Sequence, residues 1–333
     1  MAGKRDSKRQ AWFSQGVTAF QRARPGAPAV YPCPLCIRGF TTPNALTLED
    51  VPPKAVGGKP LVLTCRTCNN TSGHLLDSHI RSGQDLKEMT EGKREASIRL
   101  TQFGHTINAL ATFSPGGISI AGLPKHSDPK AHKALFDELE RAAASGSTDW
   151  NITITMSSRH SPQREGVGWL RVGYLYAFAS LGYQWVMRPE LEPIREQFRK
   201  PDERLVPAVM KHTDAAPAGD GISFVHSPRE LRSILVRLGK NLFFFPNFNE
   251  AADFYQRIAA QRQSSDTMRI DGYHIDLPTK PLFAFDHDPR FMVLTVPPDE
   301  RKKRVPHNKA LQPTSRARSA SAKSKKRSRA ARG

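Results

Sequence analysis

All four cysteines of this 333-residue chain lie close together in the sequence, as two C-x-x-C pairs. Cys33 pairs with Cys36 and Cys65 pairs with Cys68, with 28 residues between the pairs. Each short pair can present two thiolates to one ion from a tight turn, and four thiolates complete the tetrahedral coordination of Zn²⁺. The paired pattern, which leaves no cysteine over, predicts a structural zinc site that stabilises the fold and has no open position for chemistry.

The chain shows no pattern typical of a membrane or secretory segment. Its best candidate for a membrane span, Val167 to Val186, is interrupted by Arg171 and is rich in Gly and Tyr, so we expect no membrane-spanning helix. The first residues carry charge without an apolar h-region, so we expect no secretory signal. We therefore expect a cytoplasmic protein, where C-x-x-C pairs are typical of metal sites rather than disulfides.

The positive charge is concentrated at the two ends of the chain. The net charge is +19, of which Arg301 to Gly333 contributes 13 Lys and Arg with no acidic residue, and Met1 to Arg24 contributes +5. Residues 25–300 therefore carry a net charge of only +1. Charge alone does not indicate that this central part binds nucleic acid. The basic end can add salt-sensitive, sequence-independent affinity for nucleic acid, or it can be an appendage.

Composition and patterning predict an α+β fold class with four segments. Residues 1–29 form a basic helix and linker, 30–85 a zinc-bound ββα domain, 96–300 a larger α+β domain of unknown role, and 301–333 a disordered basic tail. The tail has no core-forming residue after Leu311, so burial cannot offset the entropy of ordering it.

The larger domain has both strand and helix patterns. Alternating apolar residues predict strands at 97–103, 106–113, 118–121, 150–156, 222–225, 268–277 and 291–296, and helical spacing predicts helices at 129–144, 168–185, 189–199 and 249–261. Segment 234–245 fits either a helix or a hairpin that turns at Gly239-Lys240. The helix at 168–185 is apolar on most sides, so we expect it at the centre of this domain.

The residues between the two cysteine pairs predict two strands followed by a helix. Leu46–Asp50 has a strand pattern, the prolines that follow it break the strand, and Gly57-Gly58 is typical of a turn. Leu61–Thr64 predicts the returning strand and Asn69 the start of a helix. This order places one cysteine pair at each end of a ββα unit.

These residues resemble the HNH endonuclease family in its zinc-stabilised ββα-metal form. The resemblance rests on the two C-x-x-C pairs, on Glu49-Asp50 at the end of the first strand, on the segment Pro53-Lys-Ala-Val-Gly57-Gly58, and on Asn69 directly after the last cysteine. A weaker likeness covers 174–195, which resembles the region that follows the motif in stand-alone members of the family.

The resemblance implies a metal-dependent endonuclease that hydrolyses phosphodiester bonds. A divalent ion, Mg²⁺ or a relative, would polarise the phosphodiester while a histidine activates water. Carried over position by position, Glu49 matches the acidic metal ligand and Asn69 the ligand on the helix. Asn70 and His74, spaced i, i+4, can offer a further ligand from one helix face. The implied catalytic residues are Glu49, Asp50 and His74.

The chain departs from the family pattern at Asp50, where the family carries its general-base histidine. The ordinary pKa of aspartate lies about 2.6 units below that of histidine, so aspartate is the weaker proton acceptor. Three interpretations are open. Asp50 can act as ligand or base, with its pKa raised by burial or by Glu49 beside it. His74 or His79 can supply the base. Alternatively, the nuclease is inactive and the fold persists as a zinc module that binds nucleic acid or protein.

Three basic residues flank the expected site. Lys54, Lys59 and Arg66 are suited to contacts with phosphate, and ordinary surface solubility is the alternative. The expected partner is nucleic acid, DNA rather than RNA, and no membrane. The sequence leaves the oligomeric state open.

Overall fold

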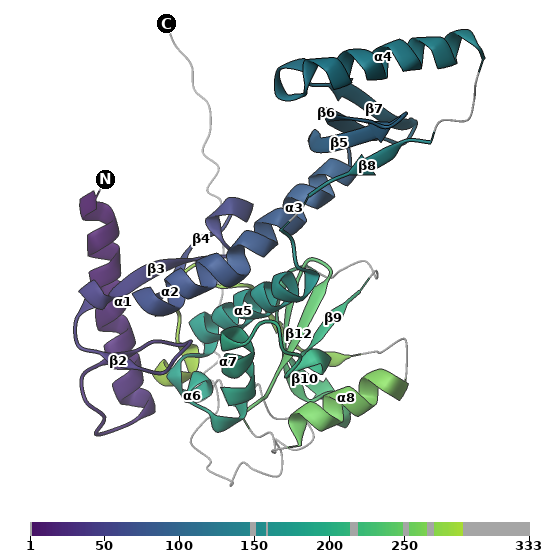
Figure 1. Cartoon of the computed structure of the whole chain (residues 1–333). Helices are drawn as coiled ribbons and strands as arrows, with labels where there is room; N and C mark the ends of the chain where they lie inside the picture. Colours follow the sequence, from purple (N-terminus) through teal and green to yellow (C-terminus); the bar gives the residue numbers. More distant parts are fainter. Residues whose placement is uncertain are drawn as a thin grey trace, which may run out of the picture. The chain divides into compact units, whose positions relative to one another are not determined.

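The computed structural model describes residues 2–146, 151–157, 159–213, 219–248, 253–264 and 270–288, which form a mixed α+β structure (Figure 1). All of these residues belong to one structural unit, Met1–Thr295. The predicted strand at 291–296 and the predicted disordered tail at 301–333 lie outside the described residues.

Groups of strands and groups of helices follow one another along the chain. The helices are α1 (Ala2–Ala23), α2 (Arg66–Ser72), α3 (Ser78–Thr90), α4 (Pro129–Ala144), α5 (Pro162–Leu181), α6 (Tyr183–Val186), α7 (Glu192–Arg199), α8 (Phe254–Ser264) and α9 (Ala284–His287), and a π-helical turn, Gly73–Asp77, joins α2 to α3. The strands are β1 (Tyr31–Pro32), β2 (Gly39–Phe40), β3 (Leu46–Val51), β4 (Lys59–Cys65), β5 (Ala96–Gln102), β6 (His105–Ser114), β7 (Gly117–Gly122), β8 (Thr153–Thr155), β9 (Met210–His212), β10 (Gly221–Ser227), β11 (Ser233–Leu238), β12 (Asn241–Phe245) and β13 (Asp271–Ile275).

The strands form four antiparallel sheets. The first two are the hairpins β1-β2 and β3-β4, the third has the order β7-β6-β5-β8, and the fourth has the order β13-β10-β11-β12-β9. The segment 234–245, which fitted two patterns, is the hairpin β11-β12. Its turn contains Gly239 with a φ of 57°, which glycine adopts without strain. The predicted order of strand, strand and helix between the cysteine pairs is present as β3, β4 and α2.

Buried apolar residues group into two cores, and the predicted domain 96–300 contributes to both. The smaller core joins β5, β6 and α4, with Ile98, Leu100 and Leu135 among its members. The larger core includes residues of α1, of α5–α7 and of the fourth sheet. It also includes residues of the segment 30–85, which contains all four cysteines and which we call the cysteine segment. The cysteine segment therefore shares its core with the second half of the chain, across the predicted boundary between 85 and 96.

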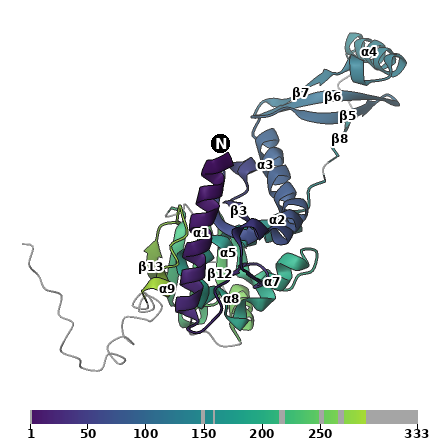
Figure 2. The same cartoon turned by 90° about the vertical axis from the view of Figure 1, so that its left-hand side faces the viewer.

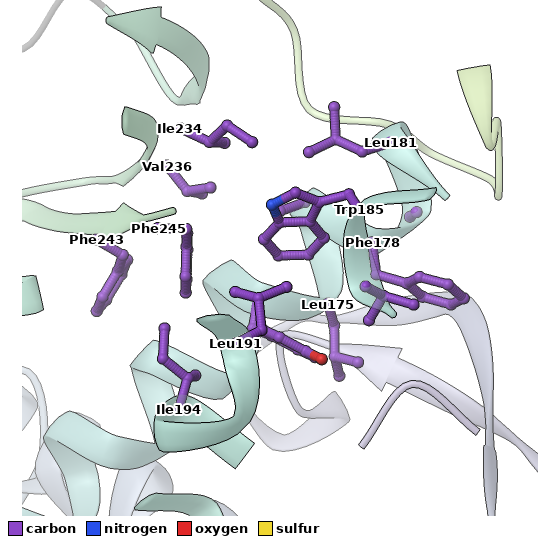
Figure 3. Packing of buried hydrophobic residues seen from close by; sticks show 14 of the residues in the cluster. Leu175, Phe178, Leu181, Trp185, Leu191, Ile194, Ile234, Val236, Phe243 and Phe245 are labelled. Atoms are coloured by element: carbon purple, nitrogen blue, oxygen red, sulfur yellow. The ribbon is translucent and has the colours of Figure 1, made fainter. Parts of the chain in front are cut away.

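Helix α5 lies at the centre of the larger core. It contacts α3, β3, β4, β11 and β12. The predicted helix 168–185 is divided in two, since α5 ends at Leu181 and α6 begins at Tyr183. Gly182 between them has a φ of 88°, a conformation that L side chains rarely adopt. Trp185 of α6 points toward Val236 and Phe245 of the β11-β12 hairpin (Figure 3). There the ring of Trp185 lies 5.8 Å from that of Phe245, and its indole donates to the Pro246 carbonyl at 3.0 Å.

Three tyrosines of α5 and α6 donate hydrogen bonds to backbone carbonyls of the cysteine segment. The bonds run from Tyr174 to Pro34 at 2.9 Å, from Tyr176 to Val51 at 2.9 Å and from Tyr183 to Pro32 at 3.1 Å. Each hydroxyl satisfies a carbonyl that lies outside a regular hydrogen-bond ladder or at the end of one, where an unpaired buried group would cost stability. The second half of the chain thereby fixes the loops that surround the cysteines.

Candidate functional site

The first cysteine pair lies in the loop between β1 and β2. The Cys33 amide donates to the Arg38 carbonyl at 2.9 Å, and the Ile37 amide donates to the Cys33 carbonyl at 2.8 Å. Ile37 has a φ of 61°, which is unfavourable for a β-branched residue. Such a conformation costs about 1–3 kcal/mol and persists only where the surroundings impose it. Here the turn brings Cys36 back toward Cys33.

The second cysteine pair lies where β4 ends and α2 begins. Cys65 is the N-cap residue of α2, and its sulfur accepts from the Cys68 amide at 3.4 Å. The Cys65 amide in turn donates to the sulfur of Cys33 at 3.3 Å. Backbone amides therefore point at sulfur atoms within and between the two pairs, which favours the thiolate form.

The four cysteine sulfur atoms lie close together in one cluster. All lie within 4.8 Å of one another, and the Cys36 and Cys65 sulfurs are 3.8 Å apart. A Zn–S bond of about 2.3 Å in a regular tetrahedron places two sulfurs about 3.8 Å apart. The predicted cysteine cluster is confirmed, and it can hold one metal ion, which is consistent with zinc.

The surroundings shift the pKa values of the four thiols in different directions. Burial raises the pKa of Cys33, whereas hydrogen bonding to Cys33 lowers the pKa of Cys65 to about 6. The Arg38 guanidinium donates to the Cys65 sulfur at 3.9 Å and adds one positive charge beside the cluster. A bound dication would stabilise all four thiolates together, since a coordinating thiol is deprotonated outright.

Glu49 is enclosed by protein on all sides. Its side chain is 2 % exposed, one carboxylate oxygen accepts from the Arg171 guanidinium at 2.6 Å, and the other accepts from the Thr64 hydroxyl at 2.8 Å. Arg171 comes from α5, is 1 % exposed, and also donates to Asp77 at the end of the π-helical turn. We call Glu49, Arg171 and Asp77 the buried ion triad. It links β3, α5 and the helical segment after the second cysteine pair.

A β-bulge separates Glu49 from Asp50. The register of β3 against β4 shifts between these two residues, so that Glu49 opposes Val62 and Asp50 opposes Pro60. Bulges commonly re-aim side chains next to functional sites. Glu49 is buried here while Asp50 is partly exposed. Burial raises the pKa of Asp50, and Glu49 adds to this.

Basic groups from two distant segments surround Asp50. Arg5 and Lys8 of α1 and Lys54 of the turn between β3 and β4 all act electrostatically on its carboxylate and lower its pKa against the effect of burial. Helix α1 lies beside β3 and β4, as both views show (Figure 1 and Figure 2). We call Arg5, Lys8 and Lys54 the basic surface. Lys59 and Arg66, at the starts of β4 and α2, are exposed as well.

The other predicted site residues are not gathered at Glu49. Asn70 and His74 are exposed, Asn69 is partly exposed, and the side chains of these three make no hydrogen bond or ion pair with any residue that the structure describes. His79 accepts from the Ser161 amide at 3.0 Å, so this ring nitrogen is engaged. Among the described residues, the four cysteines are the one group of three or more His, Cys, Asp or Glu whose ligand atoms lie close enough to hold a metal.

The arrangement of Glu49 does not fit the divalent ion that the resemblance implies. Both of its carboxylate oxygens are engaged, and a guanidinium already supplies the neighbouring positive charge. A metal ion there would have to displace Arg171 from Glu49 and leave the buried guanidinium with Asp77 as its remaining carboxylate partner, which is unfavourable. A second, catalytic metal therefore remains a prediction of the resemblance alone.

Sequence reasoning missed Arg171 as a site residue. The signal was present, because Arg171 is the one charged residue in the apolar run from Val167 to Val186. Arginine is almost never fully buried unless it is paired. A lone arginine in a buried helix therefore predicts an acidic partner, although it does not say which one.

Comparison with models of protein families, with curated proteins and with solved structures finds no match for this chain. The resemblance to the HNH endonuclease family thus stays a prediction. None of the helices in the described part of the chain combines the length and apolar content needed to cross a bilayer.

We expect the purified chain to contain about one zinc ion, bound by the four cysteines. The substitution Cys65→Ser removes a buried ligand that contacts both cysteines of the other pair. Bound zinc should therefore fall to near zero, and thermal stability should drop. Elemental analysis and thermal unfolding with and without a chelator measure both effects. The exposed Ser78→Ala is the control and should keep its zinc. Full zinc content in Cys65→Ser would contradict the assignment.

The buried ion triad should matter far more to stability than a surface ion pair on the same helix. Arg171→Leu leaves Glu49 buried without its cation and should cost about 3–5 kcal/mol of unfolding free energy. Arg164→Leu is the matched control, because Arg164 also lies on α5 and pairs with the exposed Asp202 at 2.7 Å. That change should cost at most about 1 kcal/mol. Denaturant unfolding measures both, and equal losses would refute the structural role of the triad.

Proposed function

We propose that residues 30–85 form a zinc-stabilised ββα module in a cytoplasmic protein. Together with α1, this module binds the phosphodiester backbone of nucleic acid. The observation that carries the proposal is the basic surface, where the exposed cations Arg5, Lys8 and Lys54 act electrostatically on Asp50 and the adjacent Glu49 is buried. Phosphate contacts by Lys and Arg supply most of the sequence-independent affinity for nucleic acid. DNA is the proposed partner, in preference to RNA.

The geometry at Glu49 favours binding over hydrolysis. In a metal-dependent nuclease the acidic strand residue must be available to an exchangeable cation. Glu49 instead accepts from Arg171 and Thr64, both from within the protein. A guanidinium can neutralise the carboxylate, but it cannot bind and activate water as a metal does. The zinc cluster itself is closed by four protein ligands and leaves no position for a substrate.

Metal-dependent phosphodiester hydrolysis is the second candidate, and the environment of Asp50 favours it. Asp50 is partly exposed, lies beside the basic surface, and has a pKa raised by burial, which makes it a better proton acceptor than a free aspartate. In this candidate Asp50 takes the place of the family's histidine as base. Glu49, Asn69, Asn70 and His74 would be the ligands of Mg²⁺ or another divalent ion, after rearrangement of the buried ion triad.

Binding can be tested with the full zinc-bound chain and a short DNA duplex in a mobility-shift titration. Arg5→Ala/Lys54→Ala should weaken binding and lower the slope of log affinity against log salt by about 2, one for each lost phosphate contact. Lys130→Ala/Lys133→Ala on α4 removes the same charge elsewhere and should change binding less. The basic end of the chain is identical in both variants, so its contribution cancels. Equal effects of the two double variants would refute a localised surface.

Hydrolysis can be tested by incubating plasmid DNA with the same protein and Mg²⁺, Mn²⁺ or Ni²⁺. The binding proposal predicts no nicking, and it predicts that Asp50→His does not restore it, because Arg171 still holds Glu49. Nicking by the unmodified chain that is abolished in Asp50→Ala and in Glu49→Gln would establish the second candidate instead. Nicking that survives both changes would indicate a contaminating nuclease.

A further inference from the structure

A large cavity lies next to the cysteine segment and has no role in the function proposed above. Its volume is about 810 Å³, within the range of roughly 300–1,000 Å³ that is usual for small-ligand sites. It is lined by residues of α3, by one face of α5, and by residues of β9 and the β11-β12 hairpin. Pro52, which directly follows β3, also lines it. The cavity therefore begins two residues beyond Asp50.

One wall of the cavity carries two aromatic rings held by their polar ends. Trp169 and Tyr176 lie two turns apart on the same face of α5, and both are partly exposed. The Trp169 indole donates to the Glu165 carboxylate at 3.4 Å, and the Tyr176 hydroxyl donates to the Val51 carbonyl at 2.9 Å. Because these polar ends are engaged, an aromatic ligand can stack on the rings without competing for their hydrogen bonds.

Lysines from three separate elements line the same cavity. Lys87 comes from α3, Lys211 from β9 and Lys240 from the turn of the β11-β12 hairpin. The surface pair of Lys87 with Glu91, at 4.0 Å between exposed groups, is worth little. The lining of the cavity thus combines two aromatic side chains with three lysines.

The two carboxylates that line the cavity are both engaged in the protein. Glu165 accepts from His160 at 2.6 Å as well as from Trp169, and Asp220 accepts from the Gly239 amide at 2.7 Å. The lining therefore contains three lysines and two carboxylates, and hydrogen bonds within the protein already engage both carboxylates. The favoured ligand therefore has a planar aromatic part and a negative charge.

We propose that this cavity binds one nucleotide unit of a single-stranded nucleic acid, with the base stacked on Trp169 and the phosphates near Lys211 and Lys240. The proposal rests on the nucleic-acid binding proposed above and names the form of nucleic acid. Every base has a π-face, and aromatic stacking beside a basic groove is how proteins bind single strands without sequence preference. Bases inside a duplex are already stacked, so a duplex can contact the basic surface but cannot enter the cavity.

Continuity with the basic surface supports this occupant. Asp50, which Arg5, Lys8 and Lys54 surround, is joined through Val51 to Pro52 at the edge of the cavity. A backbone that crosses the basic surface can therefore place a neighbouring base in the cavity. An acidic peptide would match the charge, but it would leave the aromatic wall without a planar partner.

The test compares a fluorescent 12-residue oligothymidine single strand with a duplex of the same length, using the full zinc-bound chain. Trp169→Ala should weaken single-strand binding roughly 5- to 150-fold, the effect of losing one stacked base, and should leave duplex binding unchanged. Trp169→Phe keeps an aromatic ring and should largely restore single-strand binding. Lys211→Ala/Lys240→Ala should weaken single-strand binding. It should also lower the slope of log affinity against log salt by about 2.

A crosslinking measurement on the unmodified protein guards against a variant that fails to fold. A single strand that carries 5-bromodeoxyuridine should crosslink on irradiation to Trp169 or Tyr176, as located by mass spectrometry. Free thymidine monophosphate at high concentration should compete, whereas polyglutamate should not. Crosslinks found only elsewhere, or equal competition by polyglutamate, would overturn the proposal.

The outcomes separate the two proposals. If Arg5→Ala/Lys54→Ala weakens duplex and single strand alike while Trp169→Ala weakens the single strand alone, both stand. If Trp169→Ala binds single strands as tightly as the unmodified chain, the cavity proposal fails and the basic surface survives. If only Trp169→Ala has an effect, the cavity proposal stands as a nucleotide site and the proposed basic surface fails.

Discussion

The buried guanidinium of Arg171 is the interaction on which the arrangement of the site depends. It lies between Glu49 of β3 and Asp77, which are 122 and 94 positions away in the sequence. Removing such charges from water is costly, and only close pairing with hydrogen bonds compensates for it. Burial raises the pKa of Asp77, and Glu49 adds to this, so the two carboxylates compete for one cation. The position of α5 against the ββα unit is therefore set by charge as well as by apolar packing.

The cysteine cluster and α5 fix the cysteine segment in different ways. The cysteine cluster joins the β1-β2 loop to the start of α2 and therefore fixes the segment internally. The tyrosines of α5 and α6 and the buried ion triad fix it to the rest of the larger core. Metal binding alone would stabilise a small domain of this kind without a partner helix. Here the two devices act together, and the apolar residues of both halves form one cluster.

The parts of the site that the sequence predicts are those with a short-range signal. The cysteine pairs, the turn at Gly57-Gly58 and the strand order follow from spacing and local propensity, and the structure contains the cysteine cluster and the two strands with their helix. The partner of Glu49 could not be predicted, because it is supplied by a residue 122 positions later and depends on how α5 packs. The cavity could not be predicted for the same reason, since its walls come from several segments that are far apart in the sequence. The shared core across residues 85–96 likewise depends on tertiary contacts that local patterning does not encode.

Asp50 and Arg171 each affect one of the two groups that metal-dependent hydrolysis of a phosphodiester requires. A nuclease of the type that the motif resembles needs two groups. One is a general base that is unprotonated near pH 7 and can accept a proton, and the other is a cation that can exchange its ligands. Aspartate at position 50 weakens the first requirement, although burial raises its pKa. The guanidinium of Arg171 removes the second, because it neutralises Glu49 permanently and coordinates nothing. Restoring a histidine alone would leave the cation requirement unmet. One buried arginine is therefore the reason that binding, and not hydrolysis, is the function proposed here.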